Sequence, residues 1–462
     1  MNVAPAPTPA ELARRFPKSF RFGVADSDLQ VIGEDACLRE EQSQPTMWGW
    51  FATQSGKVHG QASPGPGVDR YHRWEEDADL IAALGFRHYR TSISWARLMR
   101  EDNSVNRAAR DWYVRYFRAL RERGIRVYAT LYHWELPLRY SLVGGWKNRA
   151  TVDDFVLHAR ASVEELGEYV DEFFILNEPW CSAHNSFYTG THAPGEANLR
   201  NALIAAHHLL LAQARAFEAI REIAPAAPVG TVINYEPAFP RSETPEDLRA
   251  AQLAHEFFNG WFLDPLFLGH YPEAISRVYA DSMPQFSQAD LDAIRIGPQL
   301  HALGINYYLG KVIADTPESP LLYEPVRLPG ESQNALGWSV CVPPVYPEGL
   351  RLGLRQIHET YGPHGLPPLA ITENGYAGED AGRVAYFGEH LRQLAAALDD
   401  GLRVSAYFAW TLMDNYEWAE GYREESRFGL VGVDREDMTR APKPSAHWFR
   451  DLLAAHGSSR PA

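Results

Sequence analysis

Two glutamates stand at the ends of short apolar runs, where an ionised carboxylate is costly to bury unless it is paired. Glu373 lies in "PLAITENGYAG", directly before Asn-Gly, and Glu178 lies in "EFFILNEP", directly before proline. A pair of carboxyl groups facing one cavity is the minimum equipment for cleaving a glycosidic bond, because one can give a proton while the other stays ionised and attacks. The residues therefore predict a carboxylate pair that acts on glycosides, and they leave open which glutamate takes which role.

The elements that must position these glutamates are short β-rich runs alternating with helical patterns. Such alternation predicts parallel strands with crossover helices, and eight runs favour a closed (β/α)8 barrel of the α/β class. One intervening pattern, "DWYVRYFRALRERG", has apolar residues at helical spacing and is expected to end at Gly124. The runs cover residues 20–25, 86–94, 126–134, 172–179, 228–236, 302–308, 368–375 and 403–410.

The carboxyl ends of barrel strands open onto one cavity, so polar residues there are candidates for function. An Arg and a Tyr hydroxyl beside one carboxylate would keep that group ionised, while the drier partner would hold its proton. The strand ends carry Arg90, His133, Asn177, Glu178, Asn306, Tyr308, Glu373, Asn374 and Trp410.

No repeat or linker divides the chain of 462 residues. We expect a single barrel domain over residues 16–455, with tails at 1–15 and 456–462. The Pro- and Gly-rich residues 311–349 are predicted to form an extended loop at the barrel mouth, where functional segments usually lie.

Composition limits the classes of molecule that this protein is expected to bind. The net charge of −15 argues against nucleic acid binding. The amino-terminal segment lacks the pattern of a secretory signal, and no apolar stretch is long enough to span a bilayer, so we expect a cytoplasmic protein. Cys37, Cys181 and Cys341 are predicted to be free thiols. We expect no metal or cofactor, a small-molecule glycoside or oligosaccharide as partner, and leave the oligomeric state open.

Six motifs together carry a family resemblance. The sequences "YRTSISWAR", "LYHWELP", "ILNEP", "GINYY", "ITENG" and "WTLMDNYEWAEGYREESRFGL" occur in the order and spacing of the family 1 glycoside hydrolases, the β-glucosidase family of retaining enzymes. The chain resembles that family from about Phe20 to Trp448. The resemblance implies a (β/α)8 barrel that hydrolyses terminal β-D-glucosides through a covalent glycosyl-enzyme.

The resemblance also implies roles for individual residues. Glu178 matches the acid/base and Glu373 matches the nucleophile, with Arg90 and Tyr308 as their expected neighbours. Trp180 and Trp338 match positions that face the leaving group. The expected sugar-binding residues are Gln30, His133, Asn177, Asn306, Trp410, Glu417 and Trp418.

The chain departs from the family pattern in three places. The usual Gln-x-Glu-Gly appears as Gln30-Val31-Ile32-Gly33, with Glu34 displaced, and the usual Asp-His-Tyr appears as Asp69-Arg70-Tyr71. The segment "SVCVPPVYPEG" is longer than usual. These departures leave the catalytic pair intact and bear on the shape of the pocket entrance.

The residues also leave other functions than hydrolysis open. The glutamates could form structural salt bridges in a silent sugar-binding protein, or the same intermediate could pass its glycosyl unit to an acceptor other than water. Glucose, galactose and fucose all remain open as the glycone. Glu417 and Glu420 would repel a phosphate dianion, so an unphosphorylated sugar is expected, and a faster rate with the 6-phosphate of nitrophenyl β-glucoside would contradict this.

Overall fold

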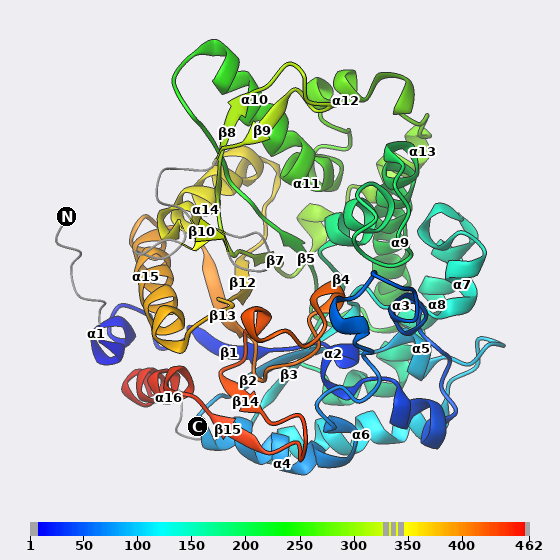
Figure 1. Ribbon diagram of the computed structural model, residues 1–462, viewed down its shortest axis with the longest axis vertical. Helices are drawn as coiled ribbons and strands as arrows, with labels where there is room; N and C mark the ends of the chain where they lie inside the picture. The colour runs from blue at the N-terminus through cyan, green and yellow to red at the C-terminus, as the bar shows by residue number, and fades with distance from the viewer. Residues whose placement is uncertain (1–7, 327–331, 334–338, 341–345, 458–462) are drawn as a thin grey trace.

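The computed structural model describes residues 8–326, 332–333, 339–340 and 346–457. Eight parallel strands close into a barrel in the spatial order β1, β13, β12, β7, β5, β4, β3, β2 (Figure 1). Each strand lies within one of the eight predicted runs, so the (β/α)8 fold class is confirmed. The barrel strands are β1 (Arg21–Ala25), β2 (His88–Ser92), β3 (Arg126–Tyr132), β4 (Glu172–Asn177), β5 (Val229–Asn234), β7 (Leu303–Asn306), β12 (Leu369–Asn374) and β13 (Val404–Trp410).

Helices surround the barrel and connect its strands (Figure 1). The helix predicted to end at Gly124 is α6 (Arg107–Glu122), and Gly124 takes a φ of +72°, a left-handed conformation that glycine adopts without steric cost. The other long crossover helices are α4 (Arg70–Ala83), α8 (Ala150–Leu166), α9 (Leu199–Ile223), α14 (Pro347–Tyr361) and α15 (Asp380–Asp399), and the long helix α16 (Pro444–His456) follows the last strand. Shorter helices are α1 (Pro9–Ala13), α2 (Asp28–Ile32), α3 (Met47–Ala52), α5 (Trp95–Leu98), α7 (Leu138–Leu142), α10 (Pro245–His255), α11 (Trp261–Phe267), α12 (Glu273–Tyr279) and α13 (Gln288–Ile294).

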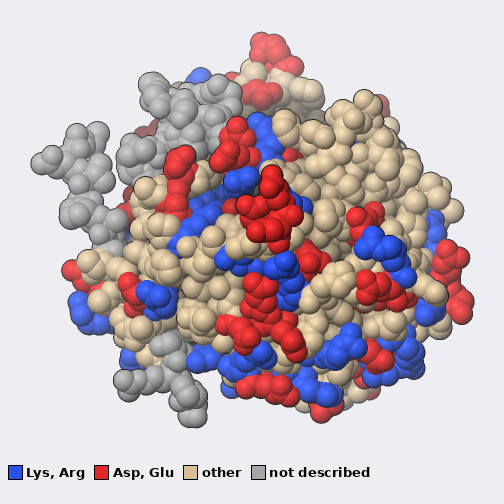
Figure 2. Space-filling model, turned by 60° about the horizontal axis from the view of Figure 1, so that its bottom comes forward, with Lys and Arg blue, Asp and Glu red and all other residues tan. Residues whose placement is uncertain are grey.

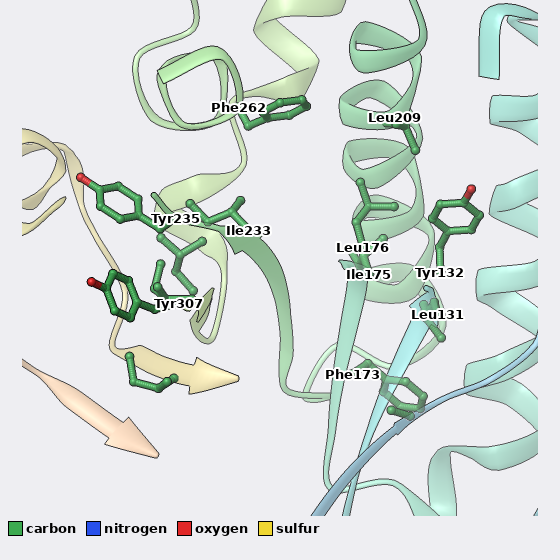
Figure 3. Packing of buried hydrophobic residues seen from close by; sticks show 14 of the residues in the cluster. Leu131, Tyr132, Phe173, Ile175, Leu176, Leu209, Ile233, Tyr235, Phe262 and Tyr307 are labelled. Atoms are coloured by element: carbon green, nitrogen blue, oxygen red, sulfur yellow. The ribbon is translucent and has the colours of Figure 1, made fainter. Parts of the chain in front are cut away.

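The core has two layers because successive strand residues point to opposite faces. In β4, Phe173 and Ile175 belong to the large cluster between strands and helices, whereas Phe174 belongs to the cluster inside the barrel. Figure 3 shows residues of the outer layer, with Ile175 on β4 and Leu209 on α9. Both faces of a barrel strand are therefore buried, which explains the near-continuous apolar runs in the sequence.

Additional strands follow β5 and β7. β6 (Ala238–Pro240), β8 (Lys311–Asp315) and β9 (Tyr323–Pro325) form a three-stranded sheet, and β10 (Ser332–Gln333) pairs with β11 (Ser339–Val340). The prediction of an extended loop over residues 311–349 is therefore wrong for the strand residues. The β-branched residues Val312 and Ile313 suit a strand, and β6 supplies the neighbour that the sequence pattern did not reveal. Trp338 and Cys341 lie outside the described residues.

The predicted amino-terminal tail contains a helix. Thr8 and Glu11 cap α1 reciprocally, Leu12 is buried in the core, and α1 lies beside α16 (Figure 1). The chain also forms a two-stranded sheet of β14 (Val431–Val433) and β15 (Arg440–Pro442).

The surface carries charges of both signs. Basic and acidic side chains are intermingled on the face shown in Figure 2. Within the part of the chain that the structure describes, every helix is too short or too polar to cross a membrane.

Candidate active site

A cavity of about 410 Å³ lies at the carboxyl ends of the barrel strands. Most of the predicted site residues line it, whereas Arg90, Asn177 and Gln30 lie behind the lining and contact it through hydrogen bonds. The predicted residues that line the cavity are His133, Glu178, Trp180, Asn306, Tyr308, Glu373, Trp410, Glu417 and Trp418.

Glu373, near the end of β12, is held by two donors. Arg90 Nη1 donates to its Oε1 at 2.8 Å, and Tyr308 Oη donates to its Oε2 at 2.7 Å. A cation and a hydroxyl therefore each hold one oxygen of this carboxylate. Such a carboxylate is suited to attack an electrophilic carbon.

Glu178, directly after β4, has a different environment. Asn306 Nδ2 donates to its Oε1 at 2.7 Å, and the Cys181 thiol donates to its Oε2 at 3.2 Å. Burial, followed by repulsion from Glu373, raises the pKa of Glu178 to about 8. Near neutral pH this carboxyl group therefore retains a proton that it can donate.

Asn177 connects the two glutamates. Its Oδ1 accepts from Arg90 Nη2 at 2.6 Å and from Asn306 Nδ2 at 3.0 Å, which fixes the orientation of its amide. Its Nδ2 lies 3.2 Å from His133 Nε2. Asn177 thus couples the neighbours of Glu178 and Glu373 and sets the ring of His133.

His133 contributes a neutral imidazole ring to the cavity lining. Burial, with a smaller effect from the charge of Arg90, holds the pKa of His133 well below its usual value, so the ring is neutral. Since Asn177 donates to Nε2, the proton is placed on Nδ1, which has no hydrogen-bond partner among the described residues.

Aromatic rings line the same side of the cavity as His133. The His133 ring lies nearly parallel to those of Trp410 and Trp418, with centroids 5.8 and 6.0 Å away. Trp134 and Trp418 pack together at 4.8 Å. These apolar faces suit the carbon face of a sugar ring.

Three residues of the site have left-handed backbone conformations that are uncommon outside glycine. The φ angles are +69° for Trp134, +48° for Glu178 and +50° for Trp418. Each costs on the order of 1–2 kcal/mol, which the surrounding packing must offset. The sharp turn at Glu178 is the local reason why a buried strand ends in an inward-facing carboxyl group.

Glu417 adds a half-buried carboxyl group to the cavity. Gln30 Nε2 lies 3.4 Å from its Oε2 and donates more closely, at 2.7 Å, to the carbonyl of Tyr416. Burial raises the pKa of Glu417 well above its usual value, and repulsion from Glu373 and Glu178 adds to this. Gln30 therefore orients the segment that carries Glu417.

The departures from the family pattern have separate explanations. Arg70 is fully buried and forms ion pairs with Asp26 and Asp77. Glu34 accepts from the backbone and side chain of Thr46, the residue that caps α3. Both side chains therefore stabilise the fold around the site.

Several lining residues were not identified by the sequence analysis. Cys181 was expected to be a packed free thiol; it is free and buried, as is Cys37, but it also contacts Glu178. Its position three residues after Glu178, within one helical turn, is the signal that could have revealed the contact. Among the other missed residues, Asn234 and Glu236 lie at the end of the predicted run 228–236, where the strand-end pattern could have revealed them, whereas Phe258 and Lys311 lie outside the predicted strands and had no such signal.

Comparisons with known proteins agree with the geometry. The model of Glycosyl hydrolase family 1 matches residues 12–458. A β-glucosidase of Agrobacterium sp. is 38% identical over 96% of this chain and 97% of its own, and β-glucosidase A of Thermotoga maritima is 34% identical over 96% and 99%.

Solved structures show the same likeness. A GH1 β-glucosidase of Exiguobacterium antarcticum B7 superimposes with a TM-score of 0.90 at 32% identity, covering 96% of this chain and 100% of its own. The virulence factor SghA, solved with its substrate analogue salicin, has a TM-score of 0.90 at 37% identity over 98% and 99% of the two chains. The chain therefore belongs to glycosyl hydrolase family 1 and is a glycoside hydrolase of the β-glucosidase type.

Proposed function

We propose that this enzyme hydrolyses terminal, unphosphorylated β-D-glucosides with retention of anomeric configuration, using Glu373 as nucleophile and Glu178 as acid/base. The observation that carries the assignment is the contrast between the two carboxyl groups. Glu373 is bound by Arg90 and Tyr308, whereas burial beside Glu373 raises the pKa of Glu178.

In the first step, a carboxylate oxygen of Glu373 forms a bond to the anomeric carbon as the bond to the leaving oxygen breaks. Glu178 transfers its proton to that oxygen, so the leaving group departs as a neutral alcohol. His133 and Glu417 line the cavity as polar groups for sugar hydroxyls, and Trp410 supplies an apolar face.

In the second step, Glu178 removes a proton from water as the water oxygen attacks the anomeric carbon. The ester bond to Glu373 breaks and the free carboxylate is restored. While Glu373 is esterified it carries no charge, so its repulsion no longer raises the pKa of Glu178. That change favours the ionised Glu178 which the second step requires.

The cluster of carboxyl groups supports an unphosphorylated sugar. Glu417 lies in one cavity with Glu178, Glu373 and Glu420. The raised pKa of Glu417 removes part of the charge on which the expected repulsion depends, so the repulsion rests more on the ionised Glu373. Acceptance of β-galactosides or β-fucosides belongs to the same proposal, because Glu417 can accept hydrogen bonds from adjacent hydroxyls in either orientation.

Release of nitrophenol from nitrophenyl β-glucoside tests activity, and proton NMR of the first-formed sugar tests stereochemistry. We expect the β-anomer to appear first and then to mutarotate. An α-anomer as the initial product would refute the two-step mechanism. The same spectra with added methanol would show methyl β-glucoside if the glycosyl-enzyme also reacts with acceptors other than water.

A further inference from the structure

A chain of hydrogen bonds fixes the amide that contacts Glu178. The guanidinium of Arg90 has only N–H donors, so the Asn177 atom that it contacts at 2.6 Å is the acceptor Oδ1. Asn306 places one amide atom 3.0 Å from the same oxygen, and that atom is therefore the donor Nδ2. Thr372 Oγ1 donates to Asn306 Oδ1 at 2.7 Å. The orientation of the Asn306 amide is thus set by Arg90 through Asn177.

This amide determines which oxygen of Glu178 carries the acidic proton. Asn306 Nδ2 donates to Glu178 Oε1 at 2.7 Å, and its two hydrogens are accounted for by Oε1 and by Asn177 Oδ1. In a protonated carboxyl group the carbonyl oxygen is the stronger acceptor, so the short hydrogen bond from Asn306 assigns that role to Oε1. The proton of Glu178 therefore lies on Oε2.

Cys181 contacts the oxygen that carries the proton. Its Sγ lies 3.2 Å from Glu178 Oε2. Cys181 N also donates to the carbonyl of Glu178 at 3.0 Å, at the start of the helical turn Cys181–Asn185, so both side chains leave the same turn of backbone. Burial, followed by repulsion from Glu178, raises the pKa of the Cys181 thiol well above its usual value. The sulfur therefore keeps its hydrogen and donates to Oε2.

The thiol affects both protonation states of Glu178. Because its S–H occupies one lone pair of Oε2, the acidic O–H of Glu178 is left to point away from the sulfur, toward the cavity that both residues line. When Glu178 is ionised, the same S–H donates to a charged oxygen, and such hydrogen bonds are stronger than those to a neutral acceptor. The thiol thus favours the ionised form, in opposition to burial and to the charge of Glu373.

The other titratable groups around Glu178 lie on several elements of the barrel. A substitution at Cys181 leaves all of them in place, so a change in the titration of Glu178 would report on the thiol. Among the described residues these groups are Glu373 on β12, Arg90 on β2, His133 after β3, Tyr308 after β7, Glu417 after β13 and Glu236 after β5.

Resting on the proposed function, we propose that Glu178 protonates the leaving oxygen from Oε2 and that Cys181 is a positioning residue whose thiol holds this oxygen. In the first step the Oε2–H bond breaks as an O–H bond forms on the leaving oxygen, and the S–H bond stays intact. In the second step Oε2 takes a proton from the attacking water, again with the thiol as hydrogen-bond donor.

Removal of the thiol tests this role through the pH profile of kcat/KM for nitrophenyl β-glucoside, which reports titration of the free enzyme. Cys181→Val has a similar volume but no donor, so the decline at alkaline pH should move up by about 0.5–1 pH unit. Cys181→Ser keeps a donor, and a hydroxyl donates more strongly than a thiol, so its decline should lie at or below the wild-type position. A purely structural role would not move the two profiles apart.

Cys37→Val is the matched control. Cys37 is also a buried free thiol, but its Sγ donates to the carbonyl of Gly33 at 3.7 Å, and it does not line the cavity. We expect this variant to leave the position of the alkaline decline unchanged.

Glu178→Gln, measured on the same substrate, separates a failure of this inference from a failure of the proposed function. If Glu178→Gln loses the alkaline decline while Cys181→Val leaves it in place, the inference is overturned and the proposed function stands. The same holds if the Val and Ser variants of Cys181 move the decline together. If Glu178→Gln keeps the decline, Glu178 is not the acid, and the proposed roles fail together with this inference.

Neutron diffraction locates the proton directly. Crystals exchanged into heavy water, below the pH of the alkaline decline, should show deuterium on Glu178 Oε2 and on Cys181 Sγ, with the S–D bond directed at Oε2. Deuterium on Glu178 Oε1, or a thiol deuterium turned away from Glu178, would overturn the inference and leave the hydrolytic function intact.

Discussion

At the scale of single residues, Glu178 and Glu373 differ in environment rather than in type. Glu373 receives hydrogen bonds from Arg90 and Tyr308, which stabilise its charge. Glu178 receives weaker hydrogen bonds, from the neutral groups of Asn306 and Cys181, and is buried beside the negative charge of Glu373. The same side chain can therefore serve as nucleophile at one position and as acid at the other.

Replacing each glutamate by alanine should give different defects. Glu373→Ala should abolish turnover of every glucoside, since no atom remains to form the glycosyl-enzyme. Glu178→Ala should lose about 10²–10⁴-fold on poor leaving groups and much less on dinitrophenyl β-glucoside, whose leaving group needs little protonation. Steady-state kinetics on the two substrate classes measures this.

Added azide distinguishes the acid/base from the nucleophile in a second experiment. It should restore turnover of Glu178→Ala and yield a β-glucosyl azide, because it attacks the glycosyl-enzyme in place of activated water. If azide restored both variants and gave the same β-glucosyl azide, the assignment of roles would be wrong.

The raised pKa of Glu178 predicts a pH dependence of activity and of stability. Since the first step needs protonated Glu178, kcat/KM should fall as pH rises through about 8. For stability, a folded-state pKa raised above the unfolded value of 4.5 means that stability is fully present below 4.5 and is lost as pH rises through about 8. Stability falls because the ionised form of Glu178 is costly to bury.

Glu178→Gln removes this titration. With dinitrophenyl β-glucoside, kcat/KM of the variant should no longer fall at alkaline pH. The Tm of the variant relative to the wild type should be higher at about pH 9 than at about pH 5. Thermal unfolding at the two pH values checks the second expectation. An unchanged Tm difference between them would show that Glu178 does not titrate as stated.

At the scale of elements, the carboxyl ends of β12 and β13 pack closely enough to require a glycine. A Cβ added at Gly375, just after β12, would lie 2.1 Å from the carbonyl oxygen of Trp410, which is backbone and cannot turn away. This contact explains why glycine follows Glu373-Asn374, and it fixes the nucleophile's strand against the strand that carries Trp410.

Gly375→Ala should therefore lower the free energy of unfolding by about 1–3 kcal/mol, as overpacking does, and reduce kcat by displacing Glu373. Denaturant unfolding and kinetics measure the two effects. Gly167→Ala is the control, because its added Cβ would meet only Val163 Cγ1 at 3.7 Å. Equal stabilities of the two variants would contradict this account of Gly375.

At the scale of the whole molecule, buried charge connects segments that are distant in sequence. Arg70 on α4 pairs with Asp26, directly after β1, and with Asp77, which also binds Arg440 on β15. The side chains of Arg70, Asp26 and Asp77 are fully buried. The first barrel strand, α4 and the carboxyl-terminal sheet are thus joined by one network.

Arg70→Met keeps most of the side-chain volume but leaves Asp26 and Asp77 short of a cation. We expect the free energy of unfolding to fall by about 3–5 kcal/mol, the usual cost of removing one partner from a buried ion pair. Arg277→Met is the control, since Arg277 and Glu273 are 73% and 82% exposed and such pairs contribute about 0–1 kcal/mol. A loss no larger than the control's would show that the network does not stabilise the fold.

The sequence by itself determined the barrel and the positions of its eight strands, because alternation and strand-end residues are local patterns that each run displays independently. It also identified Glu178 and Glu373, since a carboxylate that ends an apolar strand is conspicuous without any partner being known. Tertiary structure decided the rest: the strand nature of β8, the raised pKa of Glu178 and the pairing of Lys311 with Glu236. Each of these features depends on burial and on groups brought together from distant segments, so no local pattern in the sequence could reveal it.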